Sequence, residues 1–148
     1  MAKKIKSKKR KLKALLAIQL HRVDYGRDRV VYLLTVNKPY RYTYDRSRIV
    51  YIGTSKNGAF RVAQSAVYKG KPFLEEFGIN TLSAFVITVP GKQNVKRWKQ
   101  LESALLLAFR REYGEIPRAN KQQPRGKPES IFKDFKERSL VQILRSAG

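Results

Sequence analysis

A change of hydrophobic period within residues 48–61 constrains the fold of this chain more than any other feature. Residues 49–52 are β-branched and aromatic, which predicts a strand, and a glycine follows them directly. Beyond that turn the apolar residues recur every three or four positions, which predicts a helix with Asn57 as its N-cap. Such a strand would carry Tyr51 to the edge of a sheet, and the helix would bring Arg61 back towards it.

Two more segments have the composition of strands. Residues 29–36 are almost all apolar, and residues 82–89 form a shorter run that a Pro-Gly pair closes. The strand at 29–36 is expected to pair antiparallel with the strand at 49–52, which places Tyr32 and Tyr51 in neighbouring strands. We therefore expect an α+β fold with a small three-stranded antiparallel sheet flanked by helices.

Helices are expected after the second and third strands. The first should occupy residues 57–68 and stop there, because Gly70 and Pro72 follow, and residues 73–77 should form a short helical turn. A longer helix is expected over residues 94–113, where an asparagine can cap its start and a glycine follows its end.

The chain of 148 residues is long enough for one domain with a hydrophobic core, and its composition suggests three parts. These are a basic N-terminal arm at 1–13, a folded domain at 14–122, and a linker with a C-terminal helix at 123–148. The linker is polar and rich in proline and glycine. The final helix is expected from a Ser130 cap to about Arg145. It could pack on the domain, pair with a second subunit or contact DNA.

The charge balance indicates a polyanionic partner. Lys and Arg number 33 against 11 Asp and Glu, a formal net charge of +22, and a domain this basic suits nucleic acid better than a membrane surface. In the N-terminal arm, Lys8, Lys9 and Arg10 are expected to lie along phosphates, with a solvated tail as the alternative.

Several classes of protein are excluded by composition. The chain has no cysteine, so a disulfide framework, a zinc ribbon and a thiol nucleophile are ruled out. His21 is the only histidine, is expected at the surface, and cannot form a multi-histidine metal site within one chain. No apolar run is long enough to span a membrane, and the start does not have the pattern of a signal peptide. We expect an intracellular protein.

A row of tyrosines follows the first strand. Tyr40, Tyr42 and Tyr44 alternate with polar residues, as in an arm of a hairpin. The rings could stack on bases while Arg41 and Arg48 contact phosphates. The alternative, which we favour, is that the tyrosines pack on the sheet.

A carboxylate interrupts the apolar stripe of the long helix. Glu102 lies in the middle of that stripe, where a charge is costly unless something pairs with it. Two interpretations stay open: a structural ion pair, for example with Arg61, or a metal ligand at the floor of a basic cleft. At about 100° per residue, the stripe consists of Val95, Trp98, Leu101, Leu105, Leu106, Phe109 and Tyr113.

The ordered set of these residues resembles the GIY-YIG nuclease superfamily. The likeness covers about residues 30–121, and no single part of it is specific alone. The family has a strand ending in tyrosine, a second strand ending in Tyr-Ile-Gly, a helix arginine, a Leu-Glu-x-x-Leu helix and then a loop asparagine. The residues at these places are Tyr32, Tyr51-Ile52-Gly53, Arg61, Glu102 and Asn120.

The resemblance implies hydrolysis of DNA phosphodiester bonds with one divalent metal, Mg²⁺ or Mn²⁺. Glu102 would be the metal ligand, and Arg61 would hold the phosphoryl oxygens. Tyr51 would be the general base and Tyr32 would orient the water, or the reverse, with Asn120 completing the set. Because the reference pKa of tyrosine is about 10, the base would need nearby cations to lower it.

The chain departs from the family pattern at three auxiliary positions. Val30 stands for the glycine of the first motif, and Thr54 stands where many members have a lysine or another polar residue after Tyr-Ile-Gly. Lys56 would have to reach the site instead. Ser65 occupies the position where some members have a histidine, one turn after the arginine. The proposed catalytic set itself is present.

Three functions are compatible with these observations. The first is a metal-dependent DNA endonuclease, for which a homodimer would allow both strands to be cut. The second is a basic protein that binds DNA or RNA on the same fold without catalysis. The third treats the tyrosines as core and Glu102 with Arg61 as a buried ion pair. Glu102 distinguishes the nuclease from the binding protein, because a carboxylate repels phosphate unless a metal lies between the two.

Overall fold

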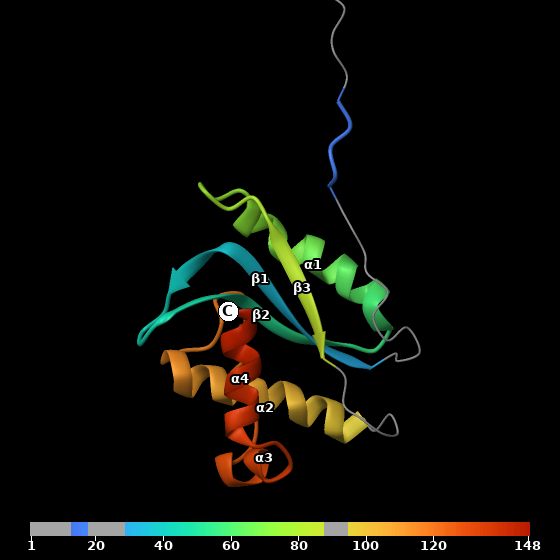
Figure 1. The fold of residues 1–148 in the computed structure, drawn as a ribbon. Helices are drawn as coiled ribbons and strands as arrows, with labels where there is room; N and C mark the ends of the chain where they lie inside the picture. Colours follow the sequence, from blue (N-terminus) through green and yellow to red (C-terminus); the bar gives the residue numbers. More distant parts are fainter. Residues whose placement is uncertain (1–12, 18–28, 88–94) are drawn as a thin grey trace, which may run out of the picture.

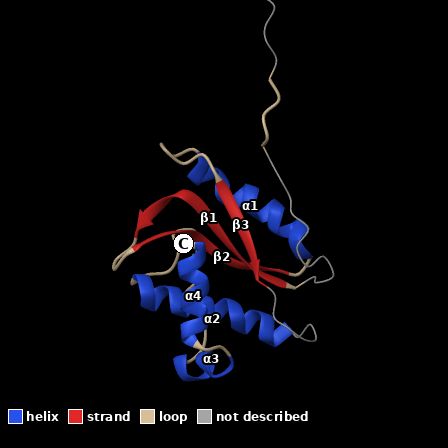
Figure 2. Cartoon of the chain, viewed as in Figure 1, coloured by secondary structure: helices blue, strands red, loops and turns tan. Residues whose placement is uncertain are grey.

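A three-stranded antiparallel sheet forms the centre of the computed structural model, which describes residues 13–17, 29–87 and 95–148. The strands are β1 (Val30–Arg41), β2 (Arg46–Ser55) and β3 (Leu82–Ile87), in the order β2-β1-β3. The first helix covers one face of this sheet, the second and last helices pack on the other face, and the short third helix packs on the second (Figures 1 and 2). The predicted α+β fold and its antiparallel sheet are confirmed.

The pairing of β1 with β2 sets the positions of the two motif tyrosines. Tyr32 lies opposite Gly53 and Leu34 lies opposite Tyr51 in the register, as expected for neighbouring antiparallel strands. The next pair is Thr35 with Ile49, so one residue of β2 is extra at this point, which is a β-bulge. The bulge lets two consecutive residues, Val50 and Tyr51, both join the apolar cluster under the first helix.

The tyrosine row packs on the sheet at its middle residue. Tyr42 is buried, and its hydroxyl donates a hydrogen bond of 2.7 Å to the carbonyl of Ile49. Tyr40 contacts the ring of Phe73 at 5.8 Å between centroids. Tyr44 is exposed at the tip of the hairpin. The favoured packing interpretation is therefore confirmed for Tyr42.

Helix α1 (Gly58–Leu74) is longer than predicted, because it continues through Pro72. The proline falls in the last turn and removes one intrahelical hydrogen bond, and the burial of Phe73 beyond it favours continuation of the helix. Gly70 allows the helix to approach β3, since a Cβ there would lie 2.2 Å from a methyl carbon of Leu82. The predicted break at these residues was wrong.

The N-terminus of α1 is held by a serine instead of the predicted asparagine. Asn57 is at the cap position but makes no side-chain capping hydrogen bond. The Ser55 hydroxyl accepts a hydrogen bond from the N–H of Asn57 at 3.2 Å and donates one to the carbonyl of Gly58 at 3.1 Å. The last residue of β2 therefore stabilises the turn that leads into α1.

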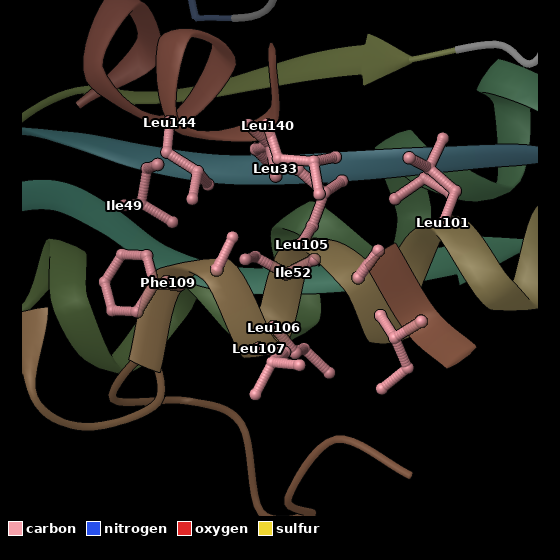
Figure 3. Close-up of a cluster of buried hydrophobic side chains, with 14 of the residues drawn as sticks. Leu33, Ile49, Ile52, Leu101, Leu105, Leu106, Leu107, Phe109, Leu140 and Leu144 are labelled. Atoms are coloured by element: carbon pink, nitrogen blue, oxygen red, sulfur yellow. The ribbon is translucent and has the colours of Figure 1, made fainter. Parts of the chain in front are cut away.

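Helix α2 (Val95–Tyr113) has the predicted length and supplies most of the core on its face of the sheet. Figure 3 shows leucines of this helix packed against Leu33 and Ile52 of the sheet. Trp98 fixes one end of α2, since its indole N–H donates a hydrogen bond of 2.7 Å to the carbonyl of Val30. The expected apolar stripe is buried at Trp98, Leu101, Leu105, Leu106, Phe109 and Tyr113.

The C-terminal region forms two helices where one was predicted. Helix α3 (Pro128–Asp134) begins at a proline, and helix α4 (Glu137–Ala147) follows after two extended residues. Leu140 and Leu144 of α4 are buried in the same cluster as α2 and the sheet (Figure 3). Of the alternatives left open, packing on the domain is what the structure shows.

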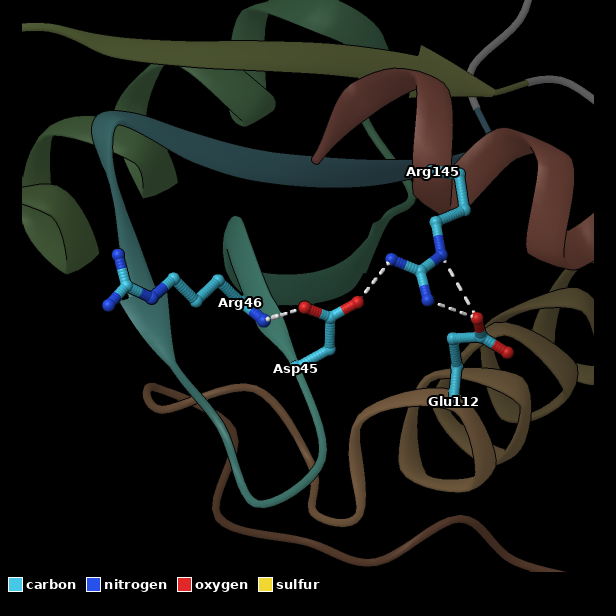
Figure 4. Close-up of polar contacts among 4 residues, drawn as sticks. All are labelled: Asp45, Arg46, Glu112 and Arg145. Atoms are coloured by element: carbon cyan, nitrogen blue, oxygen red, sulfur yellow. Dashed lines mark hydrogen bonds and ion pairs between the residues drawn. The ribbon is translucent and has the colours of Figure 1, made fainter.

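A charged network fastens α4 to the hairpin and to the end of α2 (Figure 4). The guanidinium of Arg145 donates to the carboxylate of Asp45 at 2.7 Å and, through Nε, to that of Glu112 at 2.9 Å. It also lies 5.1 Å from the ring centre of Tyr113. The hydrogen bond from Arg145 lowers the pKa of Asp45 below its usual range.

Some sequence predictions fall on residues outside the described segments. These are the basic arm with Lys8, Lys9 and Arg10, the surface position of His21, and the Asn94 cap of the long helix. Among the helices of the described segments, none is long and apolar enough to cross a membrane.

Candidate active site

A cleft of about 420 Å³ opens beside Tyr51, on the edge strand β2. Tyr51 comes from β2, Lys69 from α1 and Glu102 from α2. The cleft is therefore lined by the edge strand and by helices from both faces of the sheet. The loop after α2 forms the remaining wall. The lining residues are Tyr51, Lys69, Lys99, Glu102, Ser103, Leu106, Ala119, Asn120, Lys121, Gln122, Gln123, Pro124 and Arg125.

Tyr51 is half-buried in the cleft, next to the fully buried Tyr32. Their ring centroids lie 5.7 Å apart, and the ammonium nitrogen of Lys69 lies 4.6 Å from the ring centre of Tyr51. Burial raises the pKa of the Tyr51 hydroxyl well above its ordinary value, and Tyr32 and Glu102 raise it further. The sequence led us to expect cations that lower this pKa, and the structure gives the opposite direction.

Gly53 leaves room for the ring of Tyr51, two residues earlier on the same side of β2. A Cβ on this glycine would lie 2.4 Å from a ring carbon of Tyr51. A Gly53→Ala variant should therefore displace the ring and lose about 1–3 kcal/mol of unfolding free energy. Urea unfolding would measure the loss, and NOEs between the rings of Tyr51 and Tyr32 would report the displacement. Unchanged NOEs would contradict it.

Glu102 projects from α2 into the cleft as a half-buried carboxylate. Burial raises its pKa above the ordinary value, while the charges of Lys99 and Arg125 oppose the increase. Lys99 lies one turn earlier on the same helix. In the described segments no ion pair joins Glu102 to a cation. The carboxylate is thus partly desolvated and lies near two cations, with no ion pair to either of them in the described part of the chain.

Asn120 connects the loop after α2 to the outer edge of β2. Its carboxamide oxygen accepts a hydrogen bond from the N–H of Ile52 at 2.9 Å, and its amide nitrogen donates one to the carbonyl of Ile52 at 2.8 Å. The N–H of Ala119 donates to the carbonyl of Val50 at 2.9 Å. These contacts make Asn120 a positioning residue that holds the wall of the cleft in place.

Replacing Asn120 with alanine should destabilise the protein by roughly 1–3 kcal/mol, because both backbone groups of Ile52 lose their partner. The matched control is Asn57→Ala, which removes an exposed asparagine without a side-chain capping bond and should cost far less. Urea denaturation of both variants compares the two costs. Equal losses would contradict the role assigned to Asn120.

Arg61 is not brought into the cleft. It is exposed on α1 and donates a hydrogen bond of 3.1 Å to the side chain of Gln64. It precedes Lys69 by eight residues, which is roughly 12 Å along a helix axis. The structural ion pair between Arg61 and Glu102, one of the two interpretations of that carboxylate, is not formed.

The other expected nucleic-acid contacts lie away from the cleft. Lys56 is exposed in the turn before α1, and Arg41 and Arg48 are exposed on the hairpin strands. Arg118 was not expected, and its guanidinium lies 4.3 Å from the ring centre of Tyr40 beside Arg41. Among the described residues, these arginines do not line the cleft that holds Tyr51 and Glu102.

Sequence reasoning missed the four cations of the cleft: Lys69, Lys99, Lys121 and Arg125. Lys69 lies directly after the predicted end of the first helix, and the two loop residues fall at the boundary of the predicted linker. The one available signal was the spacing of Lys99, three residues before Glu102, which places both on neighbouring positions of a helix.

The donors in the cleft fit a magnesium ion that takes one ligand from the protein. The described residues contain no group of three His, Cys, Asp or Glu side chains that could hold a metal. Mg²⁺ is commonly bound by one or two carboxylates and completes its shell with waters and phosphates. Glu102 is the one carboxylate among the lining residues, and a cation beside it would offset the cost of its burial. Asn120 is less suitable as a metal ligand, because its carboxamide oxygen already accepts a hydrogen bond from the N–H of Ile52.

Comparison of the chain with family models, with curated proteins and with solved structures finds no match.

Proposed function

We propose that the protein is a metal-dependent endonuclease that hydrolyses phosphodiester bonds of DNA, with RNA as the alternative substrate. The proposal rests on one observation. Tyr51 and Glu102, 51 positions apart in the chain and singled out by the GIY-YIG resemblance, line one cleft with four cationic side chains. Cations suit a phosphate backbone, and a half-buried carboxylate among them suits a metal ion.

The residues of the cleft have distinct roles in this proposal. Lys69, Lys99 and the loop cations bind backbone phosphates, while the carboxylate of Glu102 would hold Mg²⁺ or Mn²⁺. When bound, the metal supplies positive charge that stabilises the phosphate and the leaving group. Tyr51 takes a proton from the attacking water, and Tyr32 fixes the orientation of its ring.

The raised pKa of Tyr51 has a consequence for the pH profile. A base whose pKa lies above neutrality is mostly protonated at pH 7, so the fraction able to accept a proton grows with pH. Cutting should therefore accelerate from pH 7 to pH 9. A Tyr51→Phe variant should lose both the activity and this dependence.

Nicking of supercoiled plasmid by purified protein, with Mg²⁺ and with EDTA, tests the proposal. Wild type should nick only with the metal. Tyr51→Phe should be inactive, and Tyr68→Phe, which alters an exposed tyrosine of α1 outside the cleft, should cut at the wild-type rate. Metal-independent cutting, or equal rates for both variants, would overturn the assignment.

The second candidate is a nucleic-acid-binding protein without catalysis. Two observations favour it: Arg61 lies outside the cleft, and Tyr51 has a raised pKa instead of a lowered one. Its signature would be tight, salt-sensitive binding of DNA by wild type and by Tyr51→Phe, with no nicking by either protein.

A further inference from the structure

The charge of the cleft exceeds what a single phosphate requires. Four cationic side chains and one carboxylate line it, an excess of three positive charges, whereas one phosphodiester carries a single negative charge. A metal ion at Glu102 would add to this excess. The cleft is therefore better matched to a stretch of backbone with consecutive phosphates than to one phosphate group.

The four cations come from three elements that line the cleft. Lys69 lies at the ring of Tyr51, on the α1 side. Lys121 and Arg125 belong to the loop after α2, and both side chains are exposed to an incoming ligand. A phosphate next to Tyr51 and Glu102 would use the lysine of α1 and the lysine that precedes Glu102 by one turn of α2, which leaves the two loop cations available for another phosphate.

The loop that presents these cations is held by hydrogen bonds at two places, before and after Lys121. Asn120 and Ala119 bind the edge of β2 through three hydrogen bonds. Further along, Arg110 of α2 donates a hydrogen bond of 2.9 Å to the side chain of Gln123. A loop held in this way positions its charges before the ligand arrives, which reduces the entropic cost of binding.

We propose that Lys121 and Arg125 form a second phosphate subsite, which holds the backbone phosphate adjacent to the one at Tyr51 and Glu102. The cleft then takes a nucleic-acid strand that continues beyond the bond to be cut, so an internal phosphodiester is favoured over an isolated nucleotide. This inference rests on the proposed function, because that function places the bond to be cut beside Glu102.

Salt dependence of binding tests the subsite without cutting. Fluorescence anisotropy of a duplex DNA in EDTA, over a series of KCl concentrations, gives log K against log salt. The double variant Lys121→Gln with Arg125→Gln should bind roughly tenfold more weakly, with a slope smaller by about 1, since each phosphate contact contributes about 0.9. The matched control, Lys133→Gln with Arg138→Gln, removes one exposed lysine and one exposed arginine outside the cleft and should keep the slope.

Two further probes make the result specific. The charge-retaining pair Lys121→Arg with Arg125→Lys should keep the wild-type slope. A 5′-phosphorylated dinucleotide, with two phosphates, should displace DNA from wild type better than a mononucleotide, and the loop double variant should lose that preference. Equal slopes for the loop and control pairs, or no preference in wild type, would overturn the subsite.

The two proposals fail in different ways. Plasmid that wild type never nicks, together with a reduced slope for the loop variant, would remove the nuclease and leave the subsite as a binding site. Metal-dependent nicking by wild type, together with an unchanged slope for the loop variant, would remove the subsite and leave the nuclease.

Discussion

A Glu102→Gln variant is expected to lose metal-dependent nicking by roughly a thousandfold. The change keeps the size of the side chain and removes the charge that would hold the metal ion. Charge stabilisation by a bound metal is worth several kcal/mol in the transition state, and each 1.4 kcal/mol or so is a factor of ten in rate. Time courses of plasmid nicking at saturating Mg²⁺ measure the loss.

The same variant should be at least as stable as wild type. Because the folded state raises the pKa of Glu102, it binds more protons than the unfolded state above the ordinary pKa of a glutamate. Wild type therefore loses stability as the pH rises through this window, and the glutamine variant does not. Urea unfolding at pH 5 and pH 8, without metal, should show an advantage for Glu102→Gln that grows with pH.

Glu75→Gln is the matched control, since Glu75 is an exposed carboxylate at the end of α1 outside the cleft. It should change neither nicking nor stability. A Glu102→Gln protein that is inactive but clearly less stable than wild type would mean that the carboxylate has a structural role. Full activity in that variant would remove Glu102 from the metal site.

A chain shortened to end at residue 136, without α4, is expected not to fold. Leu140 and Leu144 are fully buried against α2 and the sheet. Burial of each leucine contributes about 1.5–3 kcal/mol, and the surface beneath them would also become exposed. The contacts of Arg145 with Asp45 and Glu112 would be lost too. Since small domains are stable by only about 5–15 kcal/mol, the sum approaches the whole margin.

Far-ultraviolet circular dichroism and thermal unfolding of the shortened chain measure the effect, which should be loss of a cooperative transition. In the full chain, Leu144→Ala should cost about 2–5 kcal/mol, and Arg138→Ala, on the exposed face of the same helix, should cost little. A shortened chain that unfolds cooperatively near the wild-type temperature would show that the fold does not depend on α4.

The parts of the fold that were predictable are those in which hydrophobic period and position agree. The strands around Tyr32 and Tyr51 are apolar runs between turns, and α2 keeps one apolar stripe from Trp98 to Tyr113. In both cases the spacing of apolar residues along the sequence is enough to predict which face is buried. The stripe also identified Glu102 correctly as an unusual residue, because a charge at that position requires an explanation.

The errors arose where tertiary contacts override local preference. Helix α1 continues past Gly70 and Pro72 because the glycine fits against Leu82 and Phe73 is buried beyond the proline. Phe135 and Lys136 are extended and separate α3 from α4, and neither residue is a strong helix breaker. Only the proline at the start of α3 was a usable local signal.

The sequence predicted two residues that line the candidate site, but not the walls around them. Tyr51 and Glu102 meet as expected, whereas Arg61 remains outside. The loop cations could not have been found from composition, because a polar segment rich in proline and glycine is typical of a linker. What places Lys121 in the cleft is the pair of hydrogen bonds from Asn120 to Ile52, and no sequence pattern encodes such a long-range contact.

Those two hydrogen bonds also restrict how copies of this chain can associate. An edge strand normally offers its free N–H and C=O groups to a strand of another molecule. Along residues 50–52 of β2 these groups are already used by Asn120 and Ala119. Intermolecular strand addition at these residues is therefore blocked, and the alternative is addition at β3, the opposite edge of the sheet. A dimer formed in that way would leave both clefts on its outer sides, open to two separate stretches of polyanion.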